Sequence, residues 1–339
     1  MKCETEMRIN RNMLLKVAND AVEKSISSDR TIIAIYLQGS LLTEEPLIGN
    51  TADIDLFFIH SDEVGSEREI VRISDEVHLD IAHHSHRVYR QPRELRLHPW
   101  LGPAVYGCKI MYDPQHFIDF TQASVRGQFN TPANVVARVQ KQATHAREIW
   151  EGLNELAKAP TVQEVLLYIR ALEHAANAIA GLNGRCLTER RFLSQLQQHA
   201  ESVRKPGLQA GFSGLLGALK LDGERLRTWL PEWQNAYTSL GGDEVPVRLH
   251  PHRLFYYRRA IEAMLDSHTP QHAFWPLWRT WTDIIHALPE DSAHQAAWRE
   301  AGEELGLLGE DFRSKIDGLD AFLDQIEELL ESWARENGV

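Results

Sequence analysis

Two short stretches near the beginning of the chain carry residue types suited to holding a phosphate and a metal ion. Gly39-Ser40 follows one apolar run, and Asp53 and Asp55 lie at the start of a second one. A strand that ends in Gly-Ser would present backbone N–H groups and a hydroxyl to a phosphate. Because side chains alternate along a strand, the two carboxylates would lie on one face with their Cα atoms ~6–7 Å apart. These residues predict a site that holds a nucleoside triphosphate through divalent metal ions.

A metal ion would explain why carboxylates stand inside an otherwise apolar strand. Asp53 and Asp55 would repel each other and destabilise a plain core strand unless something binds them. Mg²⁺ suits this role because it takes oxygen ligands from one or two carboxylates and from substrate phosphates, with Mn²⁺ as an alternative. Asp80 is the best candidate for a third carboxylate, because it lies in a stretch that alternates apolar and polar residues. The register of the strands decides between Asp80, Asp75 and Glu76.

The elements that must position these residues can be predicted from hydrophobic periodicity. The spacing of apolar residues predicts a helix over residues 11–26, and β-branched runs predict strands. Residues 41–52 contain Pro and Gly and are expected to be irregular. The predicted strands span residues 32–38, 53–60, 68–83 as a hairpin that turns near 74–76, and 107–112.

From about residue 132 onward the pattern becomes helical. The predicted helices span 132–158, 161–181, 187–202, 223–239, 250–266, 271–288, 291–306 and 311–336. We therefore expect an α+β protein, with an N-terminal domain over residues 1–130 that holds a mixed sheet with flanking helices, and an all-helical domain over 131–339. The repeated tryptophans Trp275, Trp278 and Trp281 and the apolar stripe of the last helix are expected to belong to a core.

The motifs Leu37-Gln38-Gly39-Ser40, Asp53-Ile54-Asp55-Leu56 and Asp80 together resemble a known signature. The signature is that of the DNA polymerase β-like nucleotidyltransferase superfamily. The α/β-then-helical layout is similar to that of aminoglycoside, lincosamide and minimal nucleotidyltransferases. The resemblance covers about the first 115 residues. It departs from the pattern at Ala52, where many relatives have a serine, and Thr51 is the neighbouring hydroxyl that could take its place.

The resemblance implies a nucleotidyltransferase fold for the N-terminal domain and a role for each motif residue. Gly39 and Ser40 would cradle the triphosphate, and Asp53 and Asp55 would bind Mg²⁺. Asp80 would bind the catalytic metal or activate the acceptor hydroxyl. The implied reaction is attack of that hydroxyl on the α-phosphorus of a nucleoside triphosphate, with ATP as the expected donor. An antibiotic, a protein side chain and an RNA end are the candidate acceptors, bound by the helical domain.

The composition of the chain limits the classes of partner and the cellular location that can be expected. With 36 Lys and Arg against 48 Asp and Glu, the net charge of −12 argues against a broad grip on DNA and leaves RNA as an option. The 3 cysteines have no CxxC spacing, which predicts reduced thiols and a cytoplasmic location. No apolar run approaches the ~20 residues of a membrane-spanning helix, so a membrane role is not expected.

Other groups of residues carry weaker predictions. The arginines at 185, 190 and 191 could reach a triphosphate, but a solvated helix end is the favoured interpretation; Arg138 and Lys141 are alternative phosphate contacts. Four histidines between 78 and 86 could form a zinc site, although their spacing matches no standard motif and surface positions are favoured. The rival to an enzyme is a non-catalytic nucleotide-binding regulatory module whose helical domain binds a partner protein.

Overall fold

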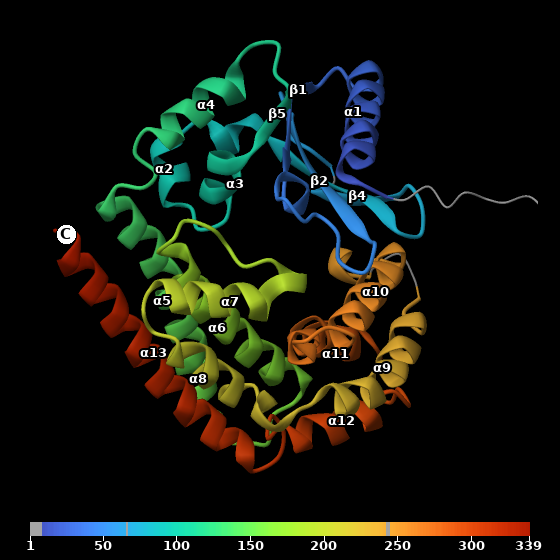
Figure 1. Cartoon of the computed structure of the whole chain (residues 1–339), viewed down its shortest axis with the longest axis vertical. Coiled ribbons are helices and arrows are strands. Elements are labelled where there is room, and N and C mark those ends of the chain that lie inside the picture. Colours follow the sequence, from blue (N-terminus) through green and yellow to red (C-terminus); the bar gives the residue numbers. More distant parts are fainter. Residues whose placement is uncertain (1–8, 66, 242–244) are drawn as a thin grey trace, which may run out of the picture.

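A helix and a five-stranded mixed sheet stand at the beginning of the chain, and the computed structural model places them beside a large group of helices (Figure 1). The structure describes residues 9–65, 67–241 and 245–339. The first helix is α1 (Arg11–Ser28). The strands are β1 (Ile32–Gln38), β2 (Ala52–His60), β3 (Arg68–Arg72), β4 (Val77–Ser85) and β5 (Lys109–Tyr112). The expected α+β class is confirmed.

The sheet has the order β3-β4-β2-β1-β5, so that β2 and β4 are central neighbours. These two strands pair in parallel, and the other pairings are antiparallel. The predicted hairpin is confirmed as β3 and β4. Its turn is held by Ser74, whose Oγ accepts from the N–H groups of Glu76 and Val77, each at 3.2 Å. The parallel pairing of β2 with β4 is what brings Asp80 next to the Asp-x-Asp motif.

Alternation along β2 separates the core from the polar residues. Ile54 and Leu56 face α1 and join a core that also contains Leu14 and Leu79. Asp53 and Asp55, at the intervening positions, lie on the opposite face of the sheet. Farther along that face, aromatic residues pack in a second core around Tyr36. The carboxylates therefore border a buried aromatic region and are covered by elements that come later in the chain.

Short helices connect the sheet to the long ones. They are the 3-10 turns η1 (Ser40–Leu42) and η2 (His86–Tyr89) and the helices α2 (Pro92–Leu97), α3 (Leu101–Gly107) and α4 (Phe117–Arg126). The long helices of the remaining chain begin at α5 and follow the predicted segments closely. They are α5 (Pro132–Asn154), α6 (Val162–Gly181), α7 (Phe192–Ser202), α9 (Gly223–Thr238), α10 (Leu254–Leu265), α11 (Phe274–Ala287), α12 (Gln295–Glu304) and α13 (Asp311–Glu336).

Three helices were not among the predicted segments: α3, α4 and α8 (Gly207–Leu215). Glycine at three positions of α8 and Gly-Pro inside α3 give these segments the composition of loops. Several predicted helix starts are 3-10 turns instead: η3 (Glu189–Arg191), η6 (Pro251–Arg253) and η7 (Pro270–Ala273). The turns η4 (Ala218–Lys220) and η5 (Val247–Leu249) complete the elements.

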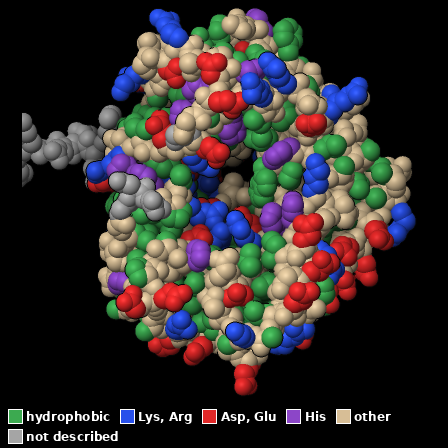
Figure 2. All heavy atoms as spheres, turned by 180° about the vertical axis from the view of Figure 1, so that it is seen from behind, with side chains coloured by type: hydrophobic (Ala, Val, Ile, Leu, Met, Phe, Trp, Pro, Cys, Tyr) green, Lys and Arg blue, Asp and Glu red, His purple; other side chains and the backbone are tan. Residues whose placement is uncertain are grey.

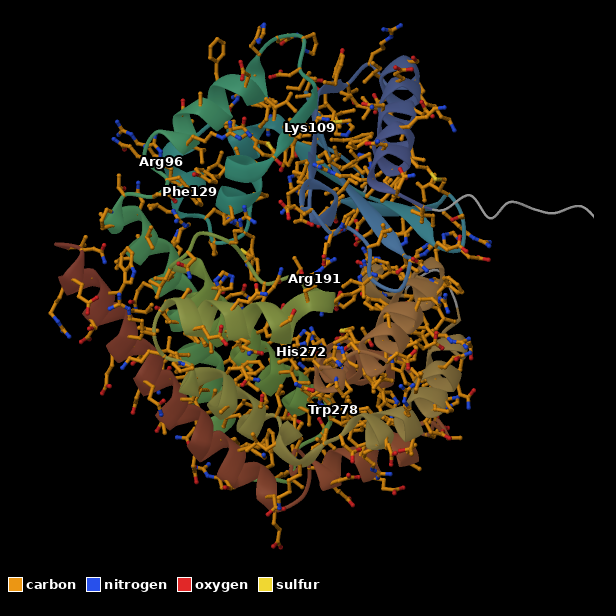
Figure 3. All side chains as sticks on the ribbon, viewed as in Figure 1. Arg96, Lys109, Phe129, Arg191, His272 and Trp278 are labelled. Carbon is orange, nitrogen blue, oxygen red and sulfur yellow. The ribbon has the colours of Figure 1, made fainter. Side chains whose placement is uncertain are left out.

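The helices share one large core, as expected for the tryptophans and for the last helix. Trp275, Trp278 and Trp281 are buried, and Trp278 lies deep among the helices in Figure 3. The apolar stripe of α13 belongs to the same core, and Figure 1 shows this helix running along the outer side of the others. Among the helices described, none is long and apolar enough to cross a membrane.

Candidate metal centre

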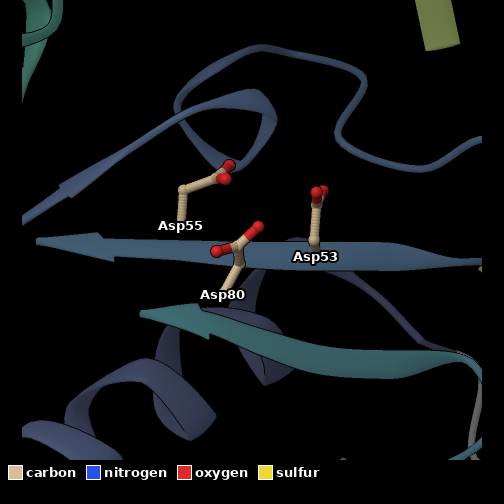
Figure 4. A group of neighbouring side chains, drawn as sticks. All are labelled: Asp53, Asp55 and Asp80. Carbon is tan, nitrogen blue, oxygen red and sulfur yellow. The ribbon is translucent and has the colours of Figure 1, made fainter. Parts of the chain in front are cut away.

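Three carboxylates meet where β2 and β4 run side by side. Asp53 and Asp55 stand on β2, and Asp80 on β4 is the direct register partner of Asp55. Each contributes an oxygen atom that lies within 4.8 Å of those from the other two (Figure 4). The alternatives for the third carboxylate lie elsewhere, because Asp75 pairs with Arg72 and Glu76 accepts from Ser74. Register thus selects Asp80 from the three acidic residues that the sequence left open.

The Gly-Ser turn after β1 closes over Asp55. Gly39 has a φ of 85° and a ψ of −158°, a conformation that is essentially reserved for glycine. A Cβ atom at this position would lie 1.8 Å from Oδ2 of Asp55, so only a glycine lets the turn approach the carboxylate. Ser40 begins η1, and its Oγ is buried without a hydrogen-bond partner among the residues that the structure describes. A buried hydroxyl without a partner is costly and marks a place where a ligand oxygen would be stabilised.

Arginines from three separate parts of the chain face the carboxylates. Arg68 on β3 donates to both oxygens of Asp80, with 2.8 Å from its Nη2 to Oδ2. Arg253 at the end of η6 forms a second, buried ion pair with Asp80. Arg190 in η3 lies 4.0 Å from Asp53. Arg190 and Arg253 both come after the last strand of the sheet, so the later part of the chain completes the site.

Arg190 is held in place by a small cluster of neighbours. Its Nη1 donates to Oγ1 of Thr51 at 2.8 Å, and its guanidinium lies 3.5 Å from the centre of the Tyr256 ring. The Tyr256 hydroxyl in turn hydrogen-bonds Asp53. The prediction of a solvated helix end was wrong for Arg190, which is 4% exposed.

The neighbouring candidates for phosphate contacts lie elsewhere. Arg191, at the start of α7 where it approaches the sheet in Figure 3, donates to the backbone oxygen of Glu45. Arg138 is buried and donates to the backbone oxygens of Arg96 and Phe129, two residues that lie well away from Arg191 in Figure 3. In the space-filling view from behind, the middle of the molecule is hollowed, and Lys or Arg side chains gather in this hollow (Figure 2).

The two carboxylates of β2 are in different electrostatic states. Burial alone would raise the pKa of Asp53, but the charges of Arg190 and Arg253 outweigh it and lower that pKa. Burial and the nearby charge of Asp53 raise the pKa of Asp55 to about 7. Asp55 therefore lacks a cation that compensates its charge, although Asp53 has one.

The chemistry of this donor set fits a divalent cation. Carboxylate oxygens from two strands, within reach of one another, are the ligands that Mg²⁺ prefers. The raised pKa of Asp55 and the unpartnered Oγ of Ser40 are both accounted for by a cation and a phosphate bound between them. Asp80 differs because its charge is already met by Arg68 and Arg253.

The histidines of β4 do not gather around a metal. His78 is 1% exposed, packs edge-on against the Tyr256 ring at 4.9 Å, and leaves its Nε2 without a partner. His84 instead hydrogen-bonds Tyr89 at 2.7 Å, and His83 contacts His60. In the part of the chain that the structure describes, the aspartates form the one group of three or more His, Cys, Asp or Glu residues with metal-binding spacing. His78 is the register partner of Asp53 and lies on the same face of β4 as Asp80, as alternation along the strand predicts, and Tyr256 of α10 covers it.

Comparisons with known proteins add little to this geometry. No protein-family model and no curated protein matches the chain. A solved structure of a nucleotidyltransferase-like protein from Exiguobacterium sibiricum 255-15 aligns with 86% of this chain and 89% of its own, at 12% identity and a TM-score of 0.28. That superposition is too loose to argue from, so the interpretation of the site rests on the residues described above.

Proposed function

We propose that the protein is a metal-dependent nucleotidyltransferase, which moves a nucleoside monophosphate from a nucleoside triphosphate to an acceptor hydroxyl. ATP is the proposed donor, and Mg²⁺ or Mn²⁺ is the proposed metal. In this proposal residues 1–130 form the catalytic part, and residues 131–339 bind the acceptor. The acceptor classes are a small molecule such as an antibiotic, a protein side chain, or an RNA end.

One observation carries the proposal. Three carboxylates from two parallel strands share one face, within 4.8 Å of one another, directly beneath a glycine turn that ends in a buried, unpartnered serine hydroxyl. A purely structural role would leave the two residues of β2 as a costly pair, because burial raises the pKa of Asp55 to about 7. A cation held against a triphosphate uses every one of these groups.

Each residue then has a role that follows from its position. Asp53 and Asp55 would hold the metal, which supplies Lewis-acid activation of the acceptor hydroxyl and neutralises charge on the leaving pyrophosphate. Gly39 lets the turn come close enough for Ser40 to donate its hydroxyl hydrogen to a phosphate oxygen. Asp80 would either complete the metal site or accept the proton of the attacking hydroxyl.

A second candidate function is favoured by the ion pairs of Asp80. Arg68 and Arg253 both bind this carboxylate, as expected for a site in which arginines neutralise the carboxylate in place of a metal ion. Such a protein would bind a nucleotide without turnover and act as a regulatory module for a partner protein. The two candidates differ in whether pyrophosphate is released.

The test is pyrophosphate release from each nucleoside triphosphate with Mg²⁺ or Mn²⁺ across a panel of hydroxyl acceptors. The wild type is compared with Asp53→Ala and Asp55→Ala, and with Asp75→Ala as a matched control outside the cluster. We expect turnover in the wild type and the control, and loss of at least ~10²-fold in the two cluster variants, with the fold retained.

The possible outcomes separate the two candidates. Equal turnover in wild type and Asp53→Ala contradicts the proposed enzyme. Metal-dependent ATP binding that requires Asp53, with no pyrophosphate released for any acceptor, supports the regulatory module instead. Binding of neither metal nor nucleotide excludes both.

A further inference from the structure

Arg253 occupies an unusual position in the molecule. It ends the turn η6, far from the sheet in sequence, and its side chain is 8% exposed where it pairs with Asp80. Its Nε atom is buried and has no hydrogen-bond partner among the described residues. A buried guanidinium is stable only when its charge and its donors are satisfied, and here one carboxylate satisfies part of it.

The three arginines at the site differ in how firmly they are held. Arg190 is fixed by Thr51 and by the ring of Tyr256. Arg68 makes a two-pronged contact with Asp80 from the exposed side of β3, where 45% of its side chain is accessible. Of these three arginines, Arg253 alone combines burial, an ion pair to Asp80 and a donor that has no partner among the described residues.

The charges around the cluster explain why this difference matters for ligand binding. Arg68 and Arg253 pair with Asp80, and Arg190 lies near Asp53, so a divalent cation that binds alone would face positive charge on several sides. The Coulomb repulsion from each nearby guanidinium weakens the binding of a cation that arrives without a phosphate. A triphosphate carries more negative charge than one bound divalent cation neutralises. The remaining negative charge on the phosphates requires cationic side chains as partners.

We propose that Arg253 exchanges partners during substrate binding: it leaves its ion pair with Asp80 and turns to a phosphate of the incoming triphosphate. The inference rests on the proposed function and adds a named residue of the helical part to it. Arg68 continues to hold Asp80 after the exchange, so that carboxylate keeps a partner. The unpartnered Nε gives Arg253 a second donor, and a guanidinium fork matches phosphate oxygens in two-pronged geometry.

The exchange makes two affinities move in opposite directions, which a merely structural role would not do. In Arg253→Gln, Mn²⁺ alone should bind at least about tenfold more tightly, because a repelling charge is gone. Inorganic tripolyphosphate with Mg²⁺ should bind about 10- to 100-fold more weakly, because charge-assisted hydrogen bonds to phosphate are lost. Mn²⁺ binding is followed by electron paramagnetic resonance, and tripolyphosphate binding by calorimetry.

Three further variants serve as controls for charge, for position and for the metal centre. Arg253→Lys keeps the charge and loses the fork, so it should bind Mn²⁺ like the wild type and tripolyphosphate more weakly; it also serves if Arg253→Gln does not fold. Arg259→Gln, an exposed arginine on α10 that pairs with Glu262, should change neither affinity. Adding Asp53→Ala to Arg253→Gln should abolish the gain in Mn²⁺ binding.

The outcomes distinguish this inference from the function on which it rests. If Arg253→Gln leaves both affinities unchanged, or lowers both together, the partner exchange is overturned. If Asp53→Ala binds Mn²⁺ and tripolyphosphate as the wild type does, the metal centre itself is refuted. If Asp53→Ala loses binding of Mn²⁺ and tripolyphosphate while Arg253→Gln binds both with wild-type affinity, the proposed function is retained and only the partner exchange is refuted.

Discussion

Replacing Gly39 by alanine tests the close approach of the Gly39-Ser40 turn to the carboxylates. The added Cβ would lie 1.8 Å from Oδ2 of Asp55 and 2.7 Å from its Cγ. To restore an ordinary contact distance, the carboxylate or the turn must move by roughly 1.5–2 Å. The substitution therefore shifts Asp55 directly and leaves the other carboxylates in place.

Two magnitudes follow from this geometry. The backbone of Gly39, with φ of 85°, strains an alanine by about 1–3 kcal/mol, so the free energy of unfolding should fall by that amount. A displacement on the order of 1 Å in a catalytic group costs ~10²-fold in rate. We expect kcat/KM for pyrophosphate release to fall by about that factor, while the protein remains folded at 25 °C.

The assay pairs kinetics with urea unfolding for Gly39→Ala and for a matched control. Gly152→Ala adds the same methyl group in α5, where nothing lies within 4 Å, and should gain up to about 1 kcal/mol in stability without a change in rate. The reasoning is refuted if Gly39→Ala keeps wild-type kcat/KM, or if its loss of rate disappears once the fraction unfolded is taken into account.

Three further predictions concern the scaffold. Trp278→Ala should lower the free energy of unfolding by ~3–5 kcal/mol in urea, since the ring is 1% exposed; a change below ~1 kcal/mol contradicts its core position. Burial lowers the pKa of His84 from 6.5, so its stabilising contribution is present above that pH and is lost as the pH falls toward the folded pKa. His84→Phe should thus flatten the decline in stability between pH 7.5 and 5, and an unchanged slope refutes this. Arg147→Ala, which removes contacts to three carboxylates of α13, should cost roughly 1 kcal/mol in the same assay, and no loss would show that these partly exposed pairs contribute nothing.

Local sequence patterns were sufficient for the elements that carry the site. Strict alternation after Glu76 indicated β4, and the apolar context of Asp53 and Asp55 indicated a strand that needs a ligand. Both inferences depend on residues that are neighbours in the sequence, so the pattern can be recognised in a single sequence. The choice of Asp80 over Asp75 needed the parallel register of β2 with β4, and register depends on pairing across the sheet.

The cationic half of the site could not be predicted because its signal is not local. Arg190 and Arg253 stand in 3-10 turns whose sequences suit a solvated helix end equally well. Arg190 is buried against Tyr256 and Thr51, which is 139 residues away in sequence, and Arg253 is buried where it pairs with Asp80. One indication was present in the carboxylates themselves, because acidic side chains that are largely removed from water require compensating charge.

The contacts of Arg190 have a consequence for how the two halves of the molecule communicate. Its guanidinium contacts Thr51 just before β2, the ring of Tyr256 on α10 and the carboxylate of Asp53. A molecule that binds better when α10 shifts must therefore also alter the field at Asp53. By thermodynamic reciprocity, whatever occupies the acidic cluster changes the affinity for that molecule by the same factor.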